Sequence, residues 1–127
     1  MEEAVHTDRN GHALQGHDPV AYFTLGEATK GDPTIATDWG GAVWLFASAE
    51  HRERFEADPG RYAPAFGGHC AVGRAFGASF PGSAKRWRID DDRLYVNKNL
   101  MVNANFPLFA RRIRKLADAA AREEGTR

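Results

Sequence analysis

Cys70, the only cysteine of the chain, is the residue best suited to reactive chemistry. It follows Gly67, Gly68 and His69, and the two glycines permit a tight turn just before it. A helix that begins here would direct backbone N–H groups at the sulfur and favour the nucleophilic thiolate. We therefore predict a redox thiol at Cys70, with a buried and inert cysteine as the alternative. Because an intrachain disulfide is impossible, a redox cycle would need an external thiol partner or a homodimer.

Three histidines form the second candidate site, a transition-metal site together with the thiol. The predicted ligands are Cys70, His69, His51 and His17, with Asp18 as a further possible carboxylate ligand. Imidazole and thiolate together suit copper or zinc. No two of these residues have a recognisable ligand spacing, so separate surface or hydrogen-bonded histidines are the alternative.

Two hairpins are predicted to form the framework that positions these residues. The apolar run over residues 42–47 is the clearest strand, and Gly40 and Gly41 suit a turn that joins it to a strand over residues 35–39. Residues 87–96 predict a second hairpin with three aspartates at its turn. Both hairpins favour antiparallel pairing.

Helices are predicted after each hairpin and around the cysteine. Ser48 is a suitable N-cap for a helix that Pro59 terminates. Residues 69–76 predict a short helix just after the two glycines. Pro107 suits the first turn of a long amphipathic helix that ends near Gly125.

These elements predict an α+β fold, a small antiparallel sheet of hairpins packed by helices, with a long amphipathic C-terminal helix. A further short strand is expected over residues 20–23. We assign residues 1–15 to an N-terminal extension and residues 16–124 to a single domain, since 127 residues is a one-domain length. We find no internal repeat in the sequence.

The charge balance excludes some classes of partner. Lysine plus arginine and aspartate plus glutamate both number 17, whereas general nucleic-acid binders carry a basic excess. No segment is long and apolar enough to span a membrane. The acidic start without an apolar run is unlike a signal peptide, so the chain as given is expected to be cytoplasmic. A mature form cut from an exported precursor would look similar.

Five segments, in this order and spacing, resemble the YHS-domain family. The resemblance is closest to the bacterial subgroup of YHS domain-containing (seleno)proteins, in which a Gly-Gly-aromatic-Cys-Ala segment is typical. It covers most of the chain, and the segments are residues 16–23, 44–55, 58–64, 67–71 and 94–97.

The resemblance implies a small domain that binds or handles a transition metal. The metal-binding cysteines of the wider family correspond to Ala21, Ala47 and His51, and two alanines cannot ligate a metal. The fold is therefore implied and that cysteine site is not. Selenocysteine in some members of the subgroup implies redox or metal chemistry at Cys70. A thiol-based redox protein and a non-catalytic interaction module are the two alternative functions.

Overall fold

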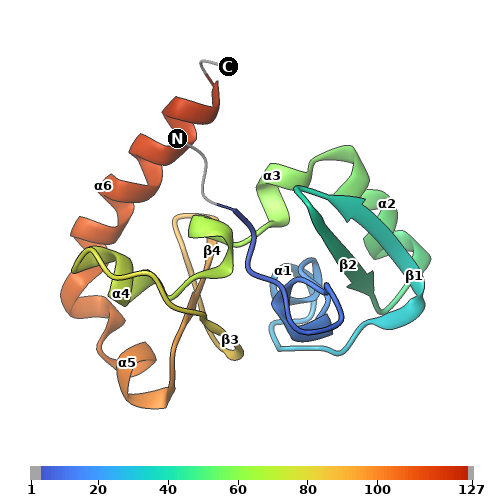
Figure 1. The fold of residues 1–127 in the computed structure, drawn as a ribbon, viewed down its shortest axis with the longest axis horizontal. Helices are drawn as coiled ribbons and strands as arrows, with labels where there is room; N and C mark the ends of the chain where they lie inside the picture. Colours follow the sequence, from blue (N-terminus) through green and yellow to red (C-terminus); the bar gives the residue numbers. More distant parts are fainter. Residues whose placement is uncertain (1–3, 126–127) are drawn as a thin grey trace.

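The computed structural model describes residues 4–125 and shows the predicted α+β fold. Two separate two-stranded antiparallel sheets are present in this part of the chain, and short helices follow each of them. Figure 1 shows the two sheets in opposite halves of the molecule, with the long helix α6 (Phe106–Gly125) along one edge. The predicted long C-terminal helix is confirmed.

The first hairpin consists of β1 (Asp32–Trp39) and β2 (Ala42–Phe46). It turns at Gly40 and Gly41, which adopt φ angles of 61° and 79° that glycine tolerates best. A bulge between Asp32 and Ala36 shifts the register of the pair. The predicted hairpin is confirmed, and its first strand begins earlier than expected.

The second hairpin consists of β3 (Ser83–Asp90) and β4 (Arg93–Asn97). It turns at Asp91 and Asp92, both at positive φ, and a bulge lies between Ser83 and Trp87. This hairpin also agrees with the sequence prediction, with β3 longer than the pattern indicated.

The helices of the first half are α1 (Ala21–Thr24), α2 (Ala49–Ala57) and α3 (Pro59–Tyr62). The Ser48 hydroxyl accepts the His51 backbone N–H, which confirms the predicted N-cap of α2. The strand predicted over residues 20–23 is wrong, because this segment enters α1. The Asp18 carboxylate accepts N–H groups at the start of that helix, and this local cap outweighs the β propensity of the apolar side chains.

The helices of the second half are α4 (Ala71–Ala75), α5 (Leu100–Ala104) and α6. The predicted short helix at the cysteine is present, with Cys70 itself as its N-cap. Asn99 caps α5 through its side chain, as Ser48 caps α2. Two 3-10 turns, η1 (Leu14–Gly16) and η2 (Ala65–Gly68), precede α1 and α4.

The two halves are copies of one structural unit, which corrects the expectation of no internal repeat. The first half runs from η1 to α3, and the second half runs from η2 to α6. The register Asp32↔Phe46 with a bulge before Ala36↔Leu45 recurs 51 residues later as Ser83↔Asn97 with a bulge before Trp87↔Val96. Each 3-10 turn contains three consecutive positive-φ residues, 52 positions apart; these are Leu14, Gln15 and Gly16 in η1, and Phe66, Gly67 and Gly68 in η2. The backbone hydrogen bond Gly31 N–H to Gly16 O likewise recurs as Gly82 N–H to Gly68 O.

Two aromatic pairs at equivalent positions lie in the two hydrophobic clusters, the first of which also includes Ala84, Leu94 and Val96 of the second half. Trp44 on β2 packs against Phe55 on α2 with ring centroids 5.0 Å apart, and both are fully buried. Tyr95 on β4 packs against Phe106 on α6 at 5.3 Å, again 51 residues later. Cys70 belongs to the second core. The repeat therefore places equivalent side chains at equivalent depths.

Candidate functional site

Cys70 lies at the N-terminus of α4 and is 1% exposed. Its Sγ atom accepts two backbone N–H groups, from Gly73 at 3.4 Å and from Lys98 at 3.3 Å. Amide donors aimed at a sulfur stabilise negative charge on it more than they stabilise the neutral thiol. The predicted helix start and its N–H groups are therefore present at the thiol.

A buried asparagine completes the surroundings of the sulfur. Asn97 is fully buried, and its Oδ1 accepts a hydrogen bond from the Cys70 thiol, with 3.8 Å between oxygen and sulfur. The same oxygen accepts the Val72 backbone N–H at 3.1 Å, and Asn97 Nδ2 donates to Asn103 Oδ1 at 2.8 Å. The sequence analysis missed Asn97, whose role becomes visible only when the halves are aligned and it falls where Phe46 stands in the first half.

The ring of Phe80 joins the two residues that donate to the sulfur. A Cβ atom on Gly73 would lie 2.6 Å from Phe80 Cζ, so the ring rests directly on this glycine. The Lys98 ammonium lies 5.2 Å from the centroid of the same ring. We call Phe80 and the Lys98 side chain the cover, because the ring rests on one donor residue and the side chain of the other donor residue lies over the ring.

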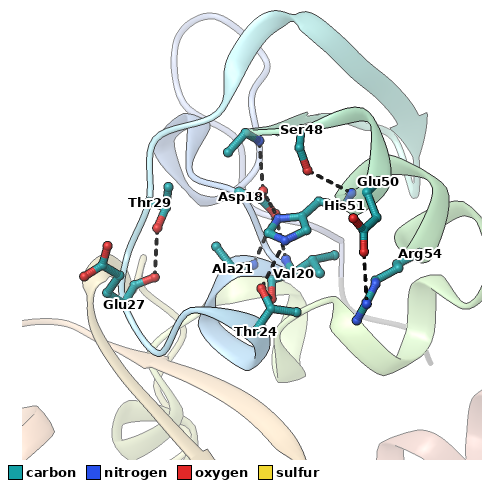
Figure 2. A network of polar contacts seen from close by, with 11 residues as sticks. Asp18, Val20, Ala21, Thr24, Glu27, Thr29, Ser48, Glu50, His51 and Arg54 are labelled. Carbon is teal, nitrogen blue, oxygen red and sulfur yellow. Dashed lines mark hydrogen bonds and ion pairs between the residues drawn. The ribbon is translucent and has the colours of Figure 1, made fainter.

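The second cluster is centred on Asp18, a fully buried carboxylate in the first half (Figure 2). Its Oδ1 accepts the backbone N–H groups of Val20 at 2.8 Å and Ala21 at 3.3 Å. Its Oδ2 accepts the Ala47 N–H at 2.9 Å and pairs with His51 Nδ1 at 2.6 Å. Four donors thus compensate the burial of this carboxylate.

The imidazole of His51 bridges this carboxylate and a hydroxyl group. Its Nε2 lies 3.1 Å from Thr24 Oγ1, at the end of α1 (Figure 2). With a proton on Nδ1, directed at Asp18, Nε2 can accept the Thr24 hydroxyl, which also donates to Val20 O at 3.3 Å. The contact with Asp18 fixes the orientation of the His51 ring.

Asp18 and Cys70 occupy the same position in the two copies of the repeat. Each is the residue after a Gly-His pair, and each accepts an N–H from the third residue after it. Each also accepts an N–H from the residue after the second strand, Ala47 in one half and Lys98 in the other. We call these two arrangements of backbone N–H groups the first nest, which holds Asp18, and the second nest, which holds Cys70.

The other two predicted ligands, His17 and His69, are also equivalent to each other. Each directs Nδ1 at a backbone carbonyl of its own turn, Leu14 O at 3.0 Å and Phe66 O at 2.8 Å. Burial lowers the pKa of His17, and the positive charges of nearby lysines lower it further. Burial, together with the charge of His69 beside it, lowers the pKa of His6.

The predicted metal ligands belong to different parts of the fold. His51 is bound to Asp18 in the first nest, whereas Cys70 contacts Asn97 in the second. In the part of the chain that the structure describes, no three His, Cys, Asp or Glu residues are grouped to hold a metal ion. The copper or zinc site at Cys70, His69, His51 and His17 stays a prediction.

Comparisons with known proteins leave the function to be inferred from the structure. No family model, no curated protein and no solved structure matches this chain. The resemblance to the YHS-domain family accordingly stays a prediction. Among residues 4–125, no helix combines the length and hydropathy needed to cross a bilayer.

Proposed function

We propose that this protein is a thiol-based redox protein in which Cys70 forms a reversible sulfenic acid and mixed disulfide. One observation carries the proposal. The sulfur occupies the second nest, whose counterpart in the first half holds the buried carboxylate of Asp18.

The first nest indicates which kind of group the second nest is suited to hold. A buried carboxylate is strongly unfavourable unless hydrogen-bond donors surround it, and the first nest supplies three backbone N–H groups. Two of these three donors have counterparts that point at the sulfur of Cys70. The third counterpart, the Val72 N–H, is taken by Asn97. With two N–H donors in place of three, the second nest is suited to a thiol that forms a thiolate during reaction.

The chemistry requires a hydroperoxide and a small thiol as co-reactants. The Cys70 thiolate attacks one peroxide oxygen; an S–O bond forms, the O–O bond breaks, and the leaving oxygen takes a proton to give water or an alcohol. An external thiol then displaces the sulfenic oxygen as water and forms a mixed disulfide. A second external thiol attacks the sulfur of the first in that disulfide; the Cys70 S–S bond breaks, Cys70 leaves as a thiol, and the two external thiols depart joined as a disulfide.

Peroxide treatment of the folded protein with a sulfenic-acid trap tests this proposal. Mass spectrometry is expected to show one trapped adduct, on the peptide that contains Cys70, and a mixed disulfide when glutathione replaces the trap. Phe80→Ala removes the ring of the cover and is expected to raise the oxidation rate about tenfold, equivalent to opening that is about 1.4 kcal/mol easier.

Phe76→Ala is the matched control, because this ring is 66% exposed and packs edge-to-face against Phe109 instead. Its oxidation rate is expected to equal that of the unmodified protein. A folded protein that gives no adduct, with or without Phe80, would contradict the redox function.

A further inference from the structure

A second reactive arrangement lies outside the second nest and does not depend on Cys70. Asp18, His51 and Thr24 form a continuous chain of contacts, 2.6 Å from carboxylate to imidazole and 3.1 Å from imidazole to hydroxyl (Figure 2). A nucleophile within reach of a base that a third group orients is the general arrangement of nucleophilic catalysis. We propose that Thr24 Oγ1 is a nucleophile for small activated acyl groups, with His51 as its general base and Asp18 as the positioning residue.

Asp18 is suited to position the base because it cannot turn away. Its carboxylate is fully buried, and backbone N–H groups from two separate segments fix both oxygens. The oxygen that accepts the Ala47 N–H also pairs with His51 Nδ1. The imidazole therefore directs Nε2 outward, where its side chain is 12% exposed.

Thr24 is suited to react because its hydroxyl lies at the surface. It is the last residue of α1 and is exposed, whereas the rest of the chain of contacts is buried or half-buried. Oγ1 also donates to Val20 O at 3.3 Å, so its single proton turns from that carbonyl to Nε2 before it is transferred. The 3.1 Å separation from Nε2 is within the reach that proton transfer to a general base requires.

The proposed step transfers an acyl group from an activated ester to the hydroxyl. The Thr24 proton moves to His51 Nε2 as Oγ1 bonds to the acyl carbon. The ester C–O bond breaks, and the departing alkoxide or phenoxide takes the proton from Nε2. Water, activated by the same imidazole, would later hydrolyse the acyl-threonine.

Turnover is expected to be slow, because the nearest backbone donors are already used. The N–H groups of Leu25 and Gly26, just after the nucleophile, both donate to Ala21 O. They are not directed at a developing oxyanion, whose stabilisation usually contributes much of the rate enhancement in acyl transfer. The expected product is therefore a stoichiometric acyl-threonine.

The test uses p-nitrophenyl acetate on a Cys70→Ser background, which removes the competing thiol and separates this inference from the redox function. Mass spectrometry is expected to show one acetyl group on the peptide that contains Thr24. Thr24→Val should abolish this label, and His51→Gln should slow it roughly a hundredfold. Thr29→Val is the matched control, since that hydroxyl donates only to Glu27 O, and it should label at the unmodified rate.

His51→Gln is chosen over a change at Asp18, whose loss is expected to destabilise the fold, and thermal unfolding checks that each variant is folded. An unlabelled folded protein would overturn the proposal. So would a label elsewhere that persists in Thr24→Val, or equal labelling rates with and without the imidazole.

Discussion

The two halves of this molecule use one backbone arrangement to hold two different groups. The first nest surrounds the buried carboxylate of Asp18 with three N–H groups and the His51 imidazole. The second nest gives the Cys70 sulfur two N–H groups and places an amide oxygen beside it. The difference teaches that one fold position holds a carboxylate with four donors in one copy and a cysteine sulfur with two backbone donors in the other.

A second difference between the halves lies in the helix after each hairpin. In the first half α2 supplies His51 to the carboxylate and then ends at Ala57. In the second half the equivalent position is Val102 on α5, and it carries no imidazole. Only the first nest therefore combines a carboxylate with a base, whereas the second leaves its sulfur to backbone donors and Asn97.

The largest expected effect is a difference in the free energy of unfolding between a variant of the first nest and a variant of the second. Asp18→Ala leaves three buried N–H groups and the His51 imidazole without their acceptor, and is expected to cost about 3–5 kcal/mol. Cys70→Ala removes two longer N–H···S hydrogen bonds and is expected to cost about 1–2 kcal/mol. Urea unfolding measures both, and equal losses would contradict the difference between the nests.

The next effect concerns two equivalent glycines, Gly31 and Gly82, each of which lies close against the second strand of its hairpin. A Cβ on Gly31 would lie 2.5 Å from the Leu45 backbone, and a Cβ on Gly82 would lie 2.5 Å from Val96 Cγ2. Gly31→Ala and Gly82→Ala are each expected to cost about 1–3 kcal/mol through overpacking, with the larger cost at Gly31, where backbone must move.

Gly60→Ala is the control for these two variants, because nothing lies within 4 Å of the added methyl group. Its free energy of unfolding is expected to stay within about 0.5 kcal/mol of the unmodified protein. A loss of stability in only one of Gly31→Ala and Gly82→Ala would contradict the equivalence of the two positions, and unchanged stability in both would contradict the close approach itself.

A smaller effect is expected at the contact between the halves. The Tyr22 hydroxyl, on α1, donates to Ala84 O on β3 at 2.7 Å, and burial raises the pKa of this tyrosine far above its ordinary value. Tyr22→Phe removes one of several hydrogen bonds between the halves, at a cost of about 1–2 kcal/mol, and leaves the Gln15 bonds to Gly82 and Ala84 in place. Calorimetry should still show a single transition, and two resolved transitions would indicate that this bond alone couples the halves.

The smallest effect is a pH dependence at His17. Because burial lowers the pKa of His17, the folded protein keeps it neutral while the unfolded chain binds a proton below about pH 6.5. The free energy of unfolding is therefore unaffected by His17 above that pH, and it falls at lower pH because only the unfolded chain binds the proton. His17→Gln, which preserves a donor for Leu14 O, should reduce this acid-side loss in urea unfolding. An unchanged pH dependence would refute the assignment.

Much of the fold was predictable because its signals are local. Ser48 and the paired glycines Gly40 and Gly41 each act on their own neighbourhood, so the cap and the turn could be read directly. The apolar segment at residues 20–23 was misread as a strand because its helix depends on the side chain of Asp18. The pattern of apolar residues in the sequence does not show that capping contact.

The site was only partly predictable, because its contacts join distant segments. The helix start at Cys70 could be foreseen from its glycines, whereas the second donor comes from Lys98 and the buried amide from Asn97. The repeat left a trace in the Gly-His pairs that precede Asp18 and Cys70, but the two copies share too few residue types for a sequence comparison to expose it.

The urea dependence of the peroxide reaction at Cys70 tests the central claim most directly. As the single thiol of the chain, Cys70 reports alone in a bulk thiol assay. If it reacts from the folded second nest when the cover moves, its oxidation rate will stay constant in urea below the unfolding transition. A rate that rises from the lowest urea concentrations with the full slope of global unfolding would show that the folded nest does no chemistry.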